Sequence, residues 1–237
     1  MASEGSDGCP MRGKAKAVPP SGCPMHSTSQ ESMHSQEQLD PRNMMPVLPQ
    51  TPAADQKMAL NKSRETSTIP KTGEEGKWVY PSPQQFYHAL LRKNKEAPAD
   101  AMDDVVRVHN VTNERSWNAI LEWEELHKKT CPTPSLLRFV GRCDDLSWGA
   151  WWSKRLSYRG VPFDRHDWFV DRCGQRTVRY VIDYYDDPAA SDASHEITVE
   201  ARPAVDTAGD FVDRLKRPGW QMQRMWTAVF GPGCPFH

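Results

Sequence analysis

Cysteines that stand directly before proline are the first residues in this chain whose type and spacing point to chemistry. Four of the six cysteines have this neighbour, where chance would give about half a case. They are Cys9, Cys23, Cys131 and Cys234. A thiolate is a soft axial donor for haem iron, and the proline removes a backbone N–H and fixes the chain direction beside it. These dipeptides make haem a candidate ligand.

Other uses of these cysteines fit the sequence less well. No Cys-x-x-Cys or Cys/His spacing of a structural zinc site is present. A disulfide framework is also a poor fit, because the cysteines lie near both ends of the chain. A single Cys-Pro is more often a turn, and Cys131 follows a predicted helix directly, so we expect it to be structural. The repeated Gly-Cys-Pro-Met at Cys9 and Cys23 favours weak, reversible contact with haem.

A histidine on an apolar helical stripe is the second candidate. Met102, Val105, Val106 and His109 follow the i, i+3, i+4, i+7 spacing of one helix face, in a helix expected from Asp100 to about Asn110. A fixed, neutral imidazole in apolar surroundings can ligate iron. The alternative is a core histidine whose hydrogen bonds are satisfied within the protein.

The surrounding pattern predicts the elements that would position these residues. A second helix is expected from Thr112 or Asn113 to about His127, with Glu114 in its first turn, where a negative charge suits the helix dipole. Ser82 is a candidate cap for an earlier helix. Residues 177–186 and 195–201 alternate as strands do, and residues 209–216 form a short helix stopped by Pro218. The fold class is therefore α+β, with helices and a small antiparallel sheet.

Aromatic residues are confined to the part of the chain from Trp78 onward. A segment without them buries too little apolar area to offset its ordering entropy, so we expect residues 1–77 to be a flexible, disordered N-terminal tail and residues 78–237 to be the folded domain.

The net charge of −1 implies no nucleic-acid partner. No apolar run approaches the ~18 residues of a membrane span, and the N-terminus resembles neither a secretory signal nor a cleaved presequence.

Several blocks of the sequence resemble one family, in order, over nearly all of residues 78–217. The matching segments are Trp78-Val79-Tyr80-Pro81-Ser82, Val108-His109-Asn110 with Asn113-Glu114 and Trp117, Pro162-Phe163-Asp164-Arg165-His166-Asp167-Trp168, Arg172-Cys173-Gly174, Arg179-Tyr180-Val181-Ile182-Asp183-Tyr184-Tyr185 and Ala201-Arg202-Pro203-Ala204. They resemble the holocytochrome c synthases, also called cytochrome c-type haem lyases. The Cys-Pro-Met motifs of the tail are similar to the family as well.

The resemblance implies an enzyme of the mitochondrial inner membrane, bound peripherally on the side of the intermembrane space. Such an enzyme takes haem b as a substrate and joins its two vinyl groups to the thiols of a Cys-x-x-Cys-His segment of apocytochrome c. The family's axial ligand to the iron falls on His109. Asn110 and Glu114 follow it, and are expected to orient the imidazole or to contact haem propionates and the apoprotein. The alternative for Glu114 is a residue that only balances the helix dipole.

Four further residues are candidates for haem contact. Guanidinium groups bind carboxylates in a bidentate manner, which makes Arg165, Arg172 and Arg179 candidates for the propionates, with surface salt bridges as the alternative. His166 is a second candidate histidine, for which a structural or proton-handling role is favoured over catalysis.

Residues 146–158 combine Trp148, Trp151 and Trp152 with basic neighbours. This composition is typical of a membrane interface or of an aromatic core under a basic edge.

Two other functions compete with the synthase. One is a non-enzymatic haem sensor or carrier that uses only its Cys-Pro motifs, which would not need His109 in an apolar setting. The other is a structural or adaptor protein of the mitochondrial membrane. The sequence has no phosphate-binding Gly-rich loop and no nucleophile elbow, which argues against kinase and hydrolase functions.

Overall fold

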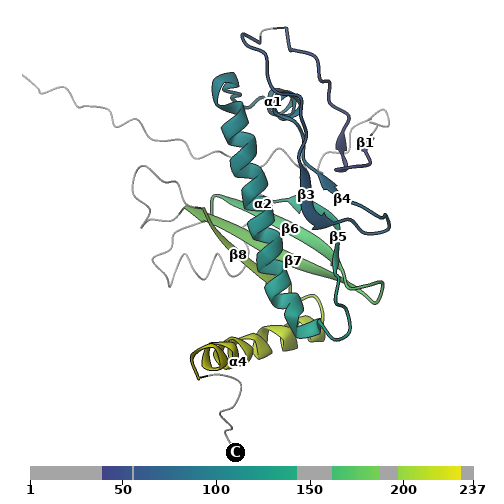
Figure 1. Ribbon diagram of the computed structural model, residues 1–237, viewed down its shortest axis with the longest axis vertical. Coiled ribbons are helices and arrows are strands. Elements are labelled where there is room, and N and C mark those ends of the chain that lie inside the picture. The colour runs from purple at the N-terminus through teal and green to yellow at the C-terminus, as the bar shows by residue number, and fades with distance from the viewer. Residues whose placement is uncertain (1–38, 55, 143–161, 187–196, 231–237) are drawn as a thin grey trace, which may run out of the picture.

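The computed structural model describes residues 39–54, 56–142, 162–186 and 197–230. A four-stranded antiparallel sheet has the order β5–β6–β7–β8, formed by Ser135–Gly141, Asp164–Asp171, Thr177–Asp186 and Ile197–Pro203. The long helix α2 (Met102–Glu124) lies across one face of this sheet, and α4 (Ala208–Phe230) crosses beside the C-terminal end of α2 (Figure 1). This arrangement confirms the α+β prediction.

A smaller layer lies near the N-terminal half of α2. It holds the hairpin of β3 (Thr66–Pro70) and β4 (Lys77–Val79), the short pair of β1 (Leu39–Asp40) and β2 (Met45–Pro46), and helix α1 (Pro83–Arg92) (Figure 1). Ser82 caps α1 through a capping box with Gln85, as expected. Two short 3₁₀ turns, Ala99–Ala101 and Glu125–His127, flank α2.

Two apolar clusters hold these layers together. The larger one packs Trp117, Ile120 and Trp123 of α2 against the sheet and against Ile69 and Trp78 of the β3–β4 hairpin. The smaller one joins α1 to the first turns of α2 through Leu60, Phe86, Tyr87, Leu90, Met102 and Val106. Strand β7 matches its predicted bounds, and the expected face of Val178, Tyr180, Ile182 and Tyr184 is buried.

The predicted boundary of the tail is wrong for residues 39–77. Met45, Leu60 and Ile69 are buried, and Arg64 bonds both Asp40 and the backbone of β4. The absence of aromatic residues did not prevent this packing, because the segment buries its aliphatic side chains against Trp78 and other aromatics that come later in the chain. The predicted tail over residues 1–38 lies outside the described residues.

Two predictions about helices are also wrong. The pair of helices expected to meet near residues 110–113 is the single helix α2. The Asn110 side chain bonds Glu65 in another segment and the Asn113 side chain bonds the His109 carbonyl, so neither caps a helix end. Helix α4 continues beyond Pro218, since a proline inside a helix removes one backbone hydrogen bond and need not end it. Within the described residues, no helix is both long and apolar enough to cross a membrane.

Candidate functional site

The middle of α2 carries the three residues that were predicted to be catalytic. Asn110 and Glu114 share one face of the helix because they are four positions apart, and His109 precedes Asn110 on the adjacent face. The apolar stripe is confirmed, as Met102 and Val106 are buried on the turns that precede His109. Since α2 begins at Met102, Glu114 lies far from the helix start and the dipole explanation for it is wrong.

His109 is half-buried and has one nitrogen without a partner. Its ring meets the ring of Phe86 on α1 edge to face, with 5.2 Å between centroids. The Nδ1 atom lies 3.1 Å from the amide nitrogen of Asn113, one turn further along the helix. The Nε2 atom is buried and has no hydrogen-bond partner among the described residues. No hydrogen-bond partner among the described residues therefore competes for this nitrogen.

Asn110 and Glu114 connect α2 to the segment that contains β3 and β4. The Asn110 amide is buried and donates to the Glu65 carboxylate at 2.8 Å. The Glu114 carboxylate accepts a hydrogen bond from the Thr68 backbone N–H at 3.0 Å, from the Tyr80 hydroxyl at 2.8 Å and from the Thr68 hydroxyl. Burial raises the pKa of Tyr80 above its ordinary value, and the bond to Glu114 adds to this effect. These bonds fix the helix that carries His109.

Sequence reasoning missed four residues of this network: Glu65, Thr68, Tyr80 and Asn113. Glu65 and Thr68 belong to the segment that was predicted to be a flexible tail. Tyr80 and Asn113 stand inside blocks that carry the family resemblance, and those blocks were the only signal that could have singled them out.

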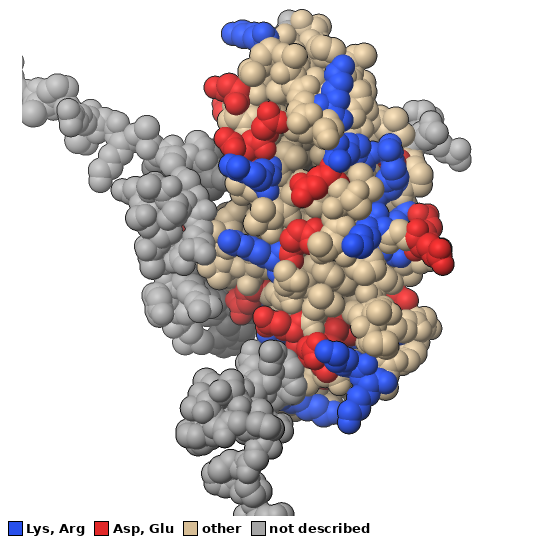
Figure 2. Space-filling view, viewed as in Figure 1, with Lys and Arg blue, Asp and Glu red and all other residues tan. Residues whose placement is uncertain are grey.

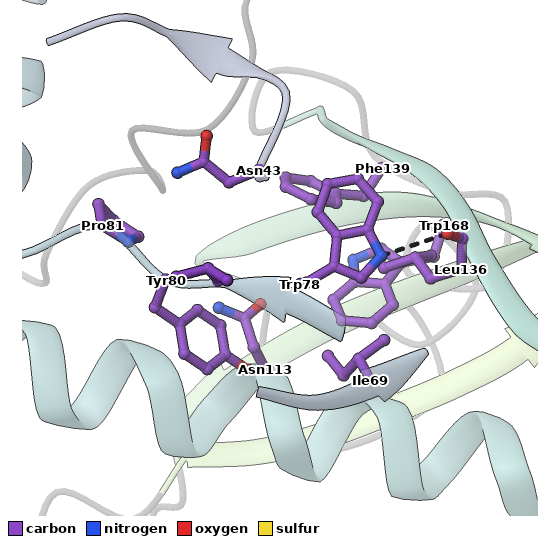
Figure 3. A pocket seen from close by; sticks show the side chains of 10 residues that line it. Asn43, Ile69, Trp78, Tyr80, Pro81, Asn113, Leu136, Phe139 and Trp168 are labelled. Carbon is purple, nitrogen blue, oxygen red and sulfur yellow. Dashed lines mark hydrogen bonds between the residues drawn. The ribbon is translucent and has the colours of Figure 1, made fainter. Parts of the chain in front are cut away.

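The cavity shown in Figure 3 is too small to hold haem. It measures about 20 Å³, which is room for about one water molecule. Its walls are mostly apolar and aromatic, with Trp78, Phe139 and Trp168 on one side and Tyr80 and Asn113 beside α2 (Figure 3). Asn113 therefore lies between this cavity and His109.

Arg172 directly follows β6 and contacts the C-terminal end of α2, where it belongs to a buried ionic network. Its guanidinium bonds the Glu124 carboxylate at 2.7 Å and the Asp213 carboxylate at 3.3 Å, and the Tyr180 hydroxyl joins the same group. His127 adds a contact of 2.9 Å to Asp213. Four of these side chains are buried: Arg172, Glu124, Asp213 and Tyr180. The Arg172 guanidinium thus already has two carboxylate partners within the protein.

Arg165, Arg179 and His166 lie on the sheet rather than on α2. Both arginines contact the buried Asp167, and Arg179 also pairs with Asp206, which lowers the pKa of that carboxyl. His166 is buried, with Nε2 3.4 Å from the Asp164 carboxylate and Nδ1 3.5 Å from the Tyr184 hydroxyl. The structure places His109, Asn110 and Glu114 on α2, Arg165 and His166 on β6, Arg179 on β7 and Arg172 directly after β6.

Two of the six cysteines fall within the described residues, and they form a disulfide between Cys131 and Cys173. This corrects the view that disulfides fit the chain poorly. The pair joins the segment between the 3₁₀ turn Glu125–His127 and β5 to the turn between β6 and β7, two segments whose proximity depends on the folded sheet. Cys9, Cys23, Cys234 and the tryptophan-rich residues 146–158 lie outside the described residues.

Charge and metal ligands add little to the site. On the face shown in Figure 2, positive and negative side chains are intermixed and no large area has one sign. Among the described residues, no group of three or more His, Cys, Asp and Glu side chains could hold a metal ion. A haem iron needs only one or two axial donors, since the porphyrin supplies the others.

Known proteins identify the family. The model of the family described as cytochrome c/c1 heme lyase matches residues 1–218. This chain belongs to the cytochrome c/c1 haem lyase family. It is 42% identical to the human "Holocytochrome c-type synthase" over 212 residues, which cover 87% of this chain and 76% of the relative. No solved structure matches it significantly.

Two fungal relatives extend the comparison. The "Holocytochrome-c synthase" of Saccharomyces cerevisiae is 37% identical over 83% of this chain and 86% of its own length. A "Putative holocytochrome-c1 synthase" of Schizosaccharomyces pombe is 39% identical over 71% of this chain and 76% of its own length. Membership in this family makes the chain a lyase that forms thioether bonds between haem and cysteine, and does not support a non-enzymatic sensor or carrier.

Proposed function

We propose that this haem lyase binds haem b through the Nε2 atom of His109 and attaches it to the Cys-x-x-Cys-His segment of apocytochrome c. The observation that carries the proposal is the buried, unpartnered Nε2 atom on the apolar stripe of α2. A buried polar atom without a partner costs about 1–3 kcal/mol, and an axial bond to iron would remove that cost.

The reaction itself needs no redox partner. The S–H bond of each cysteine adds across a vinyl double bond, so that sulfur bonds one carbon and the proton ends on the other. The protein contributes mainly by holding the reacting groups in position. In this proposal His109 binds one face of the iron, and Asn110 and Glu114 fix the helix through Glu65, Thr68 and Tyr80.

The remaining candidates receive different roles in the proposal. Arg165 and Arg179 keep part of their side chains exposed, and we assign the propionates to them. The two buried carboxylates bonded to Arg172 favour a structural role for that residue, and the buried setting of His166 favours the same. Cys9 and Cys23 are assigned weak, reversible contact with haem before transfer.

The cellular location in this proposal is the mitochondrial inner membrane, with peripheral attachment on the side of the intermembrane space. It rests on the family resemblance and on the composition of residues 146–158. A carbonate wash of isolated mitochondria tests it, since a peripheral protein should be released into the soluble fraction. Retention of the chain with the membrane pellet would contradict peripheral attachment.

Substitution of His109 tests the proposed ligand. His109→Ala, co-expressed with apocytochrome c, should fold but lower both bound haem and covalent product by more than tenfold, because it removes the axial donor. His109→Met or His109→Cys should restore part of the haem binding, as both supply a donor. Covalent haem is measured on the cytochrome by its retention under denaturing conditions.

His88 on the adjacent helix α1 provides the matched control. It bonds the Thr51 carbonyl and makes no contact with His109 in the described network, so His88→Ala should keep wild-type haem and product. Normal maturation of cytochrome c by the His109→Ala enzyme would show that the ligand assignment is wrong. His166 would then be the next candidate.

A further inference from the structure

The contact between Asn113 and His109 bears on how strongly His109 can bind iron. The amide nitrogen of Asn113 lies 3.0 Å from the carbonyl oxygen of His109 and 3.1 Å from its Nδ1 atom. An amide nitrogen carries two hydrogens and no acceptor site. One hydrogen can therefore go to the carbonyl and the other to Nδ1, and Asn113 is buried in the position that allows both.

The helix fixes the direction of this amide. If the amide were reversed, its oxygen would stand against the carbonyl oxygen of His109, where two acceptors repel each other. The bond to the carbonyl thus keeps a donor facing Nδ1. A neutral imidazole that accepts at Nδ1 carries its proton on Nε2. Before haem binds, His109 is then in the tautomer that has no lone pair for iron at Nε2.

Binding through Nε2 requires the proton to move to Nδ1, where it meets the amide donor. Histidines that hold metals usually donate this second proton to a carboxylate or carbonyl, which fixes the ring and makes the ligand more basic. In the described network around His109, the contact at Nδ1 is a donor instead. The axial bond from His109 is consequently weaker than that of a histidine with an acceptor behind it.

We propose that Asn113 is a positioning residue that keeps His109 a weak axial ligand, so that haem can leave with the cytochrome after attachment. This inference rests on the proposed function, in which His109 binds the iron. Haem in this reaction is a substrate, and a ligand bound as firmly as that of a permanent haem protein would hold the product on the enzyme.

The first test uses the haem-free enzyme. Nitrogen-15 NMR of the histidine rings, with the His109 signal assigned by its loss in His109→Ala, should show the proton of His109 on Nε2. In Asn113→Asp the carboxylate accepts from Nδ1, so the proton should be found there. A wild-type imidazole with its proton on Nδ1 would overturn the inference, whatever the role of His109 in haem binding.

The second test uses the haem-loaded enzyme without apocytochrome. Asn113→Asp should raise the stretching frequency of the ferrous iron–histidine bond in resonance Raman spectra and lower the midpoint potential, and it should slow release of holocytochrome by about tenfold. Asn113→Ala removes the donor that opposes a proton on Nδ1 but supplies no acceptor, so it should raise the stretching frequency by less than Asn113→Asp does. An unchanged or lower frequency in Asn113→Ala would overturn the inference.

Ser116→Ala provides the control for a general effect of altering the buried face of α2. Ser116 is buried one turn further along and bonds Tyr184 rather than His109, so its loss should change neither frequency nor potential. If His109→Ala retains the iron–histidine band, the proposed ligand is wrong and this inference fails with it. If His109→Ala loses the band but Asn113→Asp leaves it unshifted, only the role of Asn113 is refuted.

Discussion

The C-terminal end of helix α2 and its middle differ in whether their buried polar side chains have hydrogen-bond partners. At the C-terminal end, Glu124 is bonded by Arg172 and Tyr180, and the disulfide of Cys131 lies a few residues further on. In the middle, the polar side chains are linked to other segments, but His109 Nε2 and Asn110 Oδ1 are buried without a hydrogen-bond partner in the described structure.

This difference separates residues that stabilise the fold from residues that wait for a ligand. A buried charge network with every member paired is costly to break and offers nothing to a substrate. An unpaired atom costs stability in the free protein and gains a partner only on binding. The three predictions below test this separation through the free energy of unfolding, from the largest expected change to the smallest.

Arg172→Leu should have the largest effect. It leaves the buried carboxylates of Glu124 and Asp213 without the guanidinium that contacts both, which should lower the free energy of unfolding by about 3–5 kcal/mol. Chemical denaturation measures the change. Arg107→Ala is the control, since its pair with Asp104 is exposed and should contribute at most about 0.5 kcal/mol. Similar losses in both variants would contradict the contrast.

Reduction of the disulfide should have the next largest effect. The Cys131–Cys173 bond closes a loop with a sequence separation of 42 residues, for which loss of chain entropy in the unfolded state gives about 4 kcal/mol, with measured values typically about 2–4 kcal/mol. The enzyme should therefore unfold at lower denaturant concentration in the presence of a reductant. A variant with alanine at both positions should show no such response, and an equal response in that variant would assign the effect to other cysteines.

Tyr80→Phe should have the smallest effect, and one that depends on pH. At pH 7 it removes the hydrogen bond to Glu114 and should cost about 1–2 kcal/mol. The pKa of Tyr80 is raised in the folded protein, so above pH 10 this side chain ionises only in the unfolded chain. The free energy of unfolding of the wild type therefore falls by about 1.4 kcal/mol per pH unit. The advantage of wild type over the variant should shrink between pH 10 and pH 11, and a constant difference would contradict a protonated, buried Tyr80.

Local patterns in the sequence were sufficient for part of the fold. The alternation of residues 177–186 and the capping box at Ser82 depend on neighbours in the chain, and both were predicted. The single helix α2 could not be predicted in that way. Asn110 favours turns by local propensity, and its bond to Glu65, 45 residues earlier, keeps it inside the helix.

The site was predictable to a similar extent. The apolar spacing placed His109 on a buried stripe, and the family resemblance singled out Asn110 and Glu114. The partners of these residues come from segments 34–46 residues away, and periodicity carries no information about such pairs. The pairing of Cys131 with Cys173 was missed for the same reason.

The bonds of Arg64 limit how short an active fragment of this enzyme can be. This side chain bonds the Asp40 carboxylate and the carbonyl oxygens of Val79 and Tyr80, and so fastens the start of the described fold to β4. A fragment that begins at Trp78 would lack Glu65 and Thr68, and Asn110 and Glu114 would lose their partners. A minimal expression fragment, or a half used for protein complementation, should therefore begin before Leu39.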